Sequence, residues 1–140
     1  MMAMNDAKTF LQQIRLLETK INNKQAEKQR LRDRLYRTTP TLKPNAGTGS
    51  GSSDKLGDTT ARIVDIEAEI RKYEAEKAYI VSVLNKIPNP DQLAVLHNRY
   101  VLYKSFKQIS IDLQMPQRTV FETHRKGLQA VDEILKGDRK

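Results

Sequence analysis

Between Pro116 and Gly127 the sequence gathers side chains whose types can bind nucleic acid. Arginine can donate two hydrogen bonds to guanine O6 and N7, glutamine pairs with adenine N6 and N7, glutamate accepts from cytosine, and lysine neutralises phosphate. The spacing of Val120, His124 and Leu128 is typical of one buried helix face, so the polar residues must occupy the other. The candidate DNA-binding residues are Gln117, Arg118, Thr119, Glu122, Arg125 and Lys126. The alternative is the solvated face of a purely structural bundle.

Residues for catalysis or metal binding are scarce. The chain has no cysteine and only two histidines, His97 and His124, so a metal site would need carboxylates from several helices. His124 falls on the core-facing edge of its helix, where we expect packing, together with a phosphate contact, rather than catalysis. Acidic pairs such as Glu67 and Glu69 lie on predicted exposed faces, with no apolar pocket to raise a pKa. We therefore expect no enzyme activity, no cofactor and no metal.

Three short helices over residues 89–136 are predicted to position the candidate residues. Asn89 can cap the first helix with Pro90 at its first position, Ser105 can cap the second, and Pro116 suits the first turn of the third. The core positions on these helices are Leu93, Leu96, Tyr100, Phe106, Ile109, Leu113, Val120, His124, Leu128, Val131 and Leu135. A short second helix, a brief turn and a longer third helix are the proportions of a helix-turn-helix, whose third helix lies in the major groove.

Residues 5–87 are predicted to form a long helical hairpin. Apolar residues recur in steps of three and four from residue 5 to 37 and again from 63 to 87, where two prolines end the pattern. The segment 38–57 between them is rich in glycine, serine and threonine, which predicts a flexible loop, and it lacks the spacing of a phosphate-binding loop. Each helix would be about 45 Å long, whereas such a loop typically spans about 25 Å, so the two helices must run antiparallel.

The charges inside this hairpin also predict its register. Lys24, Lys28 and Lys77 occupy positions on the apolar seam, where a partner must neutralise them or they must extend to solvent. The pairs expected from folding about the centre of the loop are Lys24 and Lys28 with Glu67 and Glu69, and Lys77 with Glu18.

The composition agrees with an elongated all-α protein. Of the 140 residues 38% are hydrophobic and 30% are charged, and there is no tryptophan, which leaves little material for a thick core. The net charge of +8 suits a polyanionic partner, although anionic lipid would satisfy it as well as nucleic acid. Since no apolar run approaches the roughly 18 residues of a membrane span, and the start of the chain is unlike an export signal, we expect a cytoplasmic protein that does not enter a membrane.

The stretch from Arg99 to Leu135 resembles region four of bacterial sigma factors and related phage regulators. An Arg-Tyr pair ends one helix, Ile109-Ser110 stands where Ile-Ala is usual, and Arg118-Thr119-Val120 opens the recognition helix. The positions that depart from this pattern are Tyr103 for a customary Gly, Gln114 for a small residue or Gly, and Gly127 for Ala. Because glutamine disfavours a left-handed turn conformation, we expect the second turn to be of a different type. Glycine in an exposed helix would cost about 1 kcal/mol.

Nearly the whole chain is similar to a family of short proteins from phages of Gram-positive bacteria, a domain of unknown function similar to ArpU-type late-transcription regulators. The resemblance implies that Arg118 and its neighbours Gln117, Thr119 and Glu122 face DNA. The residues it implies for holding the helices at their angle are Ile109, Leu113, Val120 and Leu128.

We therefore expect a phage or prophage transcription regulator in the bacterial host cell. It would bind double-stranded DNA through the third C-terminal helix and form a homodimer through the hairpins, with RNA polymerase as a further partner. Two alternatives stay open. One is a DNA-packaging subunit like a small terminase, and the other is a protein-interaction module that contacts RNA polymerase or a sigma factor without DNA.

Overall fold

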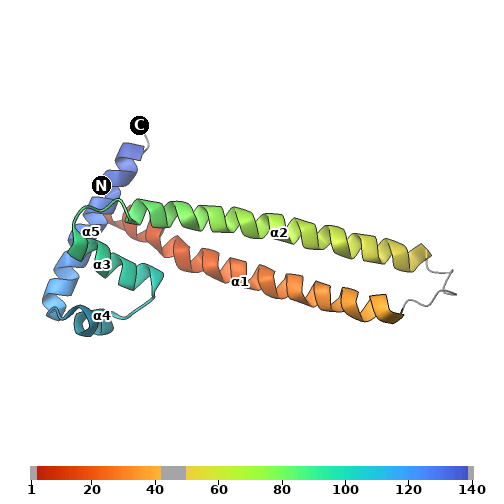
Figure 1. The fold of residues 1–140 in the computed structure, drawn as a ribbon. Helices are drawn as coiled ribbons and strands as arrows, with labels where there is room; N and C mark the ends of the chain where they lie inside the picture. The colour runs from red at the N-terminus through yellow and green to blue at the C-terminus, as the bar shows by residue number, and fades with distance from the viewer. Residues whose placement is uncertain (1–2, 42–49, 139–140) are drawn as a thin grey trace. The chain divides into compact units, whose positions relative to one another are not determined.

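The computed structural model describes residues 3–41 and 50–138, and within these ranges it contains helices and turns but no strand. The helices are α1 (Ala3–Thr41), α2 (Ser50–Leu84), α3 (Pro90–Leu96), the π-helical turn η1 (His97–Val101), α4 (Phe106–Leu113) and α5 (Gln117–Asp138). The two long helices α1 and α2 run antiparallel as a hairpin, and the shorter helices follow (Figure 1). The predicted all-α class is confirmed. None of the described helices combines the length and apolar character needed to cross a membrane.

Internal contacts divide the chain into two units. The hairpin unit comprises Glu18–Ala75, and the C-terminal unit comprises Met1–Leu17 together with Glu76–Lys140. The C-terminal unit thus contains the beginning of α1 and the end of α2 as well as the three short helices.

Within the hairpin unit, ion pairs join α1 to α2 beside the buried Ile63, Ile66 and Ile70. Lys24 Nζ lies 2.7 Å from Glu69 Oε2, and Lys28 Nζ lies 3.7 Å from a carboxylate oxygen of Glu67. The hydrogen bond between Lys24 and Glu69 raises the pKa of the lysine and lowers that of the glutamate. These are two of the pairs expected from the sequence, and further ion pairs between the helices join Arg62 to Glu27 at 3.1 Å and Arg32 to Glu67 at 3.3 Å. Because ion pairs that stay partly open to water add little stability, we expect their main effect to be on the register of the two helices.

The prediction of a loop over 38–57 is wrong at both ends of this segment. α1 continues to Thr41 and α2 begins at Ser50, so helix covers 38–41 and 50–57, while 42–49 lie outside the described residues. Serine, threonine and glycine lower helix propensity by at most about 1 kcal/mol each, whereas a helix that has already nucleated gains one hydrogen bond for each residue added. Within α2 the Thr60 hydroxyl donates to the Leu56 carbonyl at 2.9 Å, which is compatible with helix.

In the C-terminal unit the predicted helix caps are confirmed. Asn89 Oδ1 accepts hydrogen bonds from the backbone N–H groups of Asp91 and Gln92, and Pro90 is the first residue of α3. The Ser105 hydroxyl accepts from the Gln108 N–H at 3.1 Å at the start of α4. Each cap satisfies N–H groups that the first helical turn would otherwise leave without a partner.

The core of this unit combines the three short helices with both long ones. Its buried apolar residues are Ala7, Leu11, Ile14, Leu17, Ile80, Val83, Leu84, Ile87, Val95, Leu96, Tyr100, Ile109, Val120, Leu128, Val131 and Leu135. The predicted core positions Leu93, Phe106, Leu113 and His124 are only partly buried. Val95, which sequence analysis did not select, is fully buried against Ile109 and Val120.

The helix that was expected to run regularly through Tyr100 ends instead in the π-helical turn η1. Its hydrogen bond runs from the Leu102 N–H to the His97 carbonyl at 3.1 Å, one residue farther than in an α-helix. Arg99 secures the segment that follows, because its guanidinium donates to the Lys104 carbonyl at 3.0 Å and lies 4.2 Å from the centroid of the Phe106 ring.

The turn between α4 and α5 corrects the expectation for Gln114. This residue adopts the left-handed conformation, with φ 55° and ψ 46°. The Met115 N–H donates to the Ser110 carbonyl and the Gln114 N–H to the Ile111 carbonyl, which is the Schellman arrangement that usually employs glycine. The Ser110 hydroxyl also donates to the Met115 carbonyl, and these hydrogen bonds offset the roughly 1 to 2 kcal/mol that a side chain costs in this conformation.

Replacing Gln114 with glycine is expected to stabilise the protein by about 0.5 to 1 kcal/mol, because glycine has no Cβ to clash in the left-handed region. Urea unfolding monitored by circular dichroism measures the change. The matched control is Gln129→Gly, at an exposed position inside α5, which should instead lose about 1 kcal/mol. Destabilisation by both substitutions would contradict the left-handed turn.

Gly127 is buried at the contact between α5 and α3, so the cost given above for glycine in an exposed helix does not apply. A Cβ built there would lie 2.9 Å from Leu96 Cδ1 and 3.0 Å from Leu96 Cγ, and Leu96 is itself fully buried. Glycine therefore allows the two helices to approach more closely than alanine would.

Candidate nucleic-acid interface

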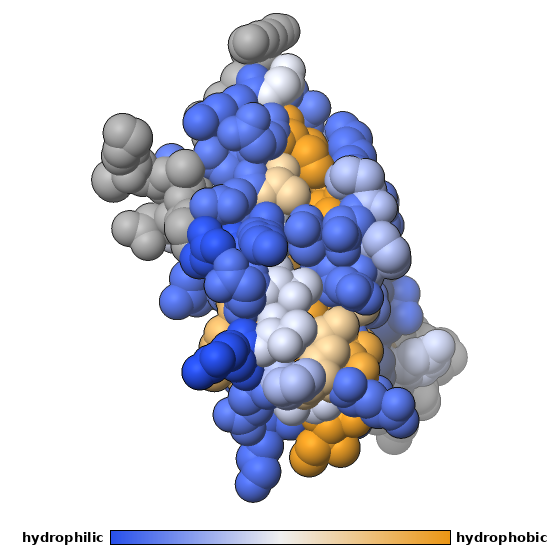
Figure 2. Space-filling model, turned by 90° about the vertical axis from the view of Figure 1, so that its left-hand side faces the viewer, coloured by the Kyte–Doolittle hydropathy of each residue, from blue (hydrophilic) through white to orange (hydrophobic). Residues whose placement is uncertain are grey.

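The structure places the six predicted DNA-binding residues on the exposed surface of the first half of α5. They are Gln117, Arg118, Thr119, Glu122, Arg125 and Lys126, and all are exposed, whereas Val120, Gly127 and Leu128 on the opposite face are buried. Hydrophilic residues cover most of the surface on the side of α4 and α5, and apolar patches lie among them (Figure 2). The sequence pattern thus placed the six polar residues, Val120 and Leu128 on the correct faces of α5, whereas Asp132, farther along the helix, is a buried polar residue.

Two of the six residues contact each other. Arg125 donates a hydrogen bond from Nη2 to Glu122 Oε1, one turn earlier. This hydrogen bond, with the positive charges of Arg125 and Lys126, lowers the pKa of the Glu122 carboxyl, which therefore stays ionised. Arg125 is partly neutralised by the pair, whereas Arg118 makes no ion pair with any residue that the structure describes.

An aromatic cluster beneath α5 sets the position of this helix against its neighbours. The Tyr100 hydroxyl lies 2.8 Å from His124 Nε2, and the Phe106 ring meets the His124 ring edge-on at a centroid distance of 5.0 Å. Phe121 packs on Phe106 at 4.9 Å. His124 therefore has the packing role expected of it. The sequence did not predict the hydrogen bond between Tyr100 and His124, although both residues stand at predicted core positions.

Sequence reasoning missed two exposed apolar side chains close to the polar ones. Ile111 on α4 is 60% exposed and Phe121 on α5 is 50% exposed, in spite of its contact with Phe106. Phe121 lies next to the predicted polar position Glu122, and neither Phe121 nor Ile111 falls on the predicted apolar face of its helix, so spacing alone did not select them. Apolar side chains of this kind can contact the methyl group of thymine or the surface of a protein partner.

Over residues 3–41 and 50–138 the structure brings together no group of three or more side chains suited to hold a metal ion. No family model, curated protein or solved structure matches the chain. The short α4, the left-handed turn at Gln114 and the longer α5 have the order and proportions of a helix-turn-helix.

Acid is expected to destabilise the C-terminal unit through His124. Burial, then the positive charges of Arg99 and Lys8, lower the pKa of His124 to about 4. Between about pH 6.5 and pH 4 the unfolded chain binds a proton at this histidine and the folded chain does not. The free energy of unfolding is therefore highest above about pH 6.5 and decreases as the pH falls toward 4. Since water screens a half-buried ring, we expect a loss of about 1 to 2 kcal/mol.

Urea unfolding at about pH 7.5 and about pH 5 measures this loss, and the His124→Phe variant is the comparison. The variant keeps an aromatic ring but cannot titrate, so the fall in its free energy of unfolding between the two pH values should be smaller. An equal fall in both proteins would assign the pH dependence to other groups.

Proposed function

We propose that the chain is a sequence-specific DNA-binding transcription regulator of a phage or prophage, which inserts the N-terminal half of α5 into the major groove. The observation that carries the proposal is the exposure of all six candidate residues on one helix, α5. The Schellman turn at Gln114 precedes this helix and fixes the direction in which the chain leaves α4. The proposed role is binding without catalysis and without a cofactor.

The residues divide into two kinds of contact. Gln117 and Arg118 in the first turn of α5 suit base edges, because the N-terminal residues of a recognition helix reach deepest into the groove. Arg125 and Lys126, farther along the helix, suit phosphate. Glu122 has two roles open to it, since its ionised carboxyl accepts from cytosine or holds Arg125 in place. The net charge of +8 favours binding through release of counterions from DNA.

Selection of bound fragments from a pool of random DNA tests this function. The expected result is an enriched motif whose occurrences map to promoter regions of the source genome. If no motif is enriched while the protein still retards DNA, the binding is electrostatic and the regulator proposal fails in its sequence-specific form.

Exposed Ile111 and Phe121 favour a second candidate, contact with RNA polymerase or a sigma factor through the same two helices. This role predicts that Ile111→Lys abolishes association with polymerase while the affinity for DNA is kept or raised. Co-sedimentation with purified polymerase measures the association. Unchanged association of the variant would count against a contact through α4.

The protein is expected to form a homodimer through the hairpin. Val64 is 54% exposed and Tyr36 is 75% exposed within the hairpin unit, and a protein that places a single recognition helix on DNA binds more tightly as a dimer that contacts two half-sites. Light scattering at concentrations on the order of tens of micromolar should report a dimer, and Val64→Lys should weaken it. A monomer would contradict the predicted homodimer, and rings of about eight or more subunits would favour the DNA-packaging alternative.

A further inference from the structure

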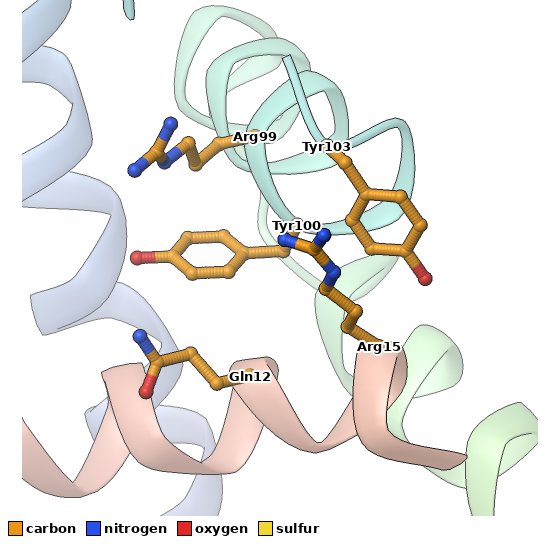
Figure 3. Close-up of a pocket in the computed structure, with 5 residues that line it drawn as sticks. All are labelled: Gln12, Arg15, Arg99, Tyr100 and Tyr103. Carbon is orange, nitrogen blue, oxygen red and sulfur yellow. The ribbon is translucent and has the colours of Figure 1, made fainter. Parts of the chain in front are cut away.

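A pocket of about 290 Å³ opens in the C-terminal unit, and none of its described lining residues belongs to α5. It is lined by Gln12, Arg15, Arg99, Tyr100 and Tyr103. Gln12 and Arg15 rise from α1 toward the two tyrosines, which come from η1 and the segment that follows it (Figure 3). A volume of this order is at the lower end for sites that hold small organic molecules.

The lining residues combine positive charge with aromatic surface. Two of the five are arginines and none of these described residues is acidic. The hydrogen bond to the Lys104 carbonyl and the Phe106 ring hold the Arg99 side chain, and Arg15 Cζ lies 5.3 Å from the centroid of the Tyr103 ring. Arginine forks match the oxygens of phosphate and carboxylate. A phosphomonoester has three free oxygens and nearly two charges, so it can engage two arginines where a carboxylate engages one.

The backbone of Tyr103 supplies an independent observation. Tyr103 has a φ of 61°, in the left-handed region where glycine costs nothing and a side chain costs about 1 to 2 kcal/mol. Strain of this kind is concentrated at functional sites. Here the strained residue places an aromatic ring against Arg15 at the wall of the pocket. Tyr100 contributes a second ring, and its hydroxyl is already paired with His124.

We propose that this pocket binds a small phosphomonoester that carries a planar ring, with the phosphate at Arg15 and Arg99 and the ring against Tyr103. The lining shares no residue with the six candidate DNA-binding residues, so the pocket is a separate site, which offers the protein a means of responding to a small molecule.

Isothermal titration with phenyl phosphate, inorganic phosphate and benzoate, in the absence of DNA, tests the proposal. Phenyl phosphate should bind with one site and a dissociation constant of about 1 mM or lower, several-fold more tightly than either other probe, since only it has both the ring and the phosphate. If phenyl phosphate shows no saturation at about 10 mM, or if benzoate binds equally well, the proposal is overturned.

Three variants assign the binding to the pocket. Arg15→Gln should weaken phenyl phosphate at least tenfold, whereas Lys72→Gln, which removes the same charge from an exposed position on α2, should change nothing. Tyr103→Gly, which relieves the backbone and so should stay folded, should weaken phenyl phosphate about twofold to tenfold and leave inorganic phosphate unchanged. Equal losses in Arg15→Gln and Lys72→Gln would show general attraction of anions and would overturn the assignment.

Discussion

Replacing Arg118 with alanine is expected to cost about 1 to 3 kcal/mol of binding energy on the preferred DNA site and much less on scrambled DNA. Arg118 is exposed in the first turn of α5 and makes no ion pair within the described residues, so its guanidinium is available for a guanine edge. The loss should therefore be one of specificity. Fluorescence anisotropy with the selected site and with a scrambled site, at several salt concentrations, measures both affinities.

Lys126→Ala is the matched comparison for Arg118→Ala. Lys126 lies two turns farther along α5, where phosphate contacts are expected, so its loss should weaken binding to both DNAs equally and reduce the salt slope by about one. It is a cleaner choice than Arg125, whose charge is already engaged by Glu122. Equal losses on both DNAs for Arg118→Ala would make it a phosphate contact, and indifference of both variants would favour the protein-interaction alternative.

Replacing Gly127 with valine is expected to destabilise the C-terminal unit by about 2 to 3 kcal/mol, because the new side chain must displace Leu96 from a fully packed position. Helix propensity alone predicts the opposite sign, since valine is a better helix former than glycine. The substitution therefore separates close packing of α3 on α5 from intrinsic helix formation. Thermal unfolding followed by circular dichroism measures the effect.

Gly137 provides a control on the same helix. A Cβ added there meets nothing within 4 Å, so Gly137→Ala should leave stability unchanged or raise it by up to about 1 kcal/mol. Opposite signs at the two glycines support the close contact with Leu96. If Gly127→Val raises stability as well, the two helices do not approach as described.

Features set by local chemistry were predictable from the sequence. The caps at Asn89 and Ser105 need only a side-chain oxygen at the start of a helix, and both form. The pairing of Lys24 with Glu69 followed from antiparallel folding and from the need of a charge on the seam for a partner. The exposed face of α5 followed from helical spacing in the same way, although the binding partner of that face does not follow from its exposure.

Features that depend on tertiary contacts were not predictable in this way. Gln114 was judged unsuited to a left-handed turn on its own preference, but hydrogen bonds to Ser110 and Ile111 override that preference. The pocket joins Arg15 to Tyr103, residues far apart in sequence, and no motif relates them. Spacing also could not show that Gly127 faces Leu96, because glycine contributes nothing to a hydrophobic pattern.

The π-helical turn at His97–Val101 has the same effect as a residue inserted into a regular helix. Removing any one residue from this turn would restore the α-helical phase and rotate the preceding helix relative to the following chain by about 100°. The hydrogen bond between Tyr100 and His124 and the hydrogen bond from Arg99 to the Lys104 carbonyl could then no longer form at the same time. This turn should therefore accept changes of side chain much more readily than a change of length, and single-residue deletions should be absent from functional variants of the protein.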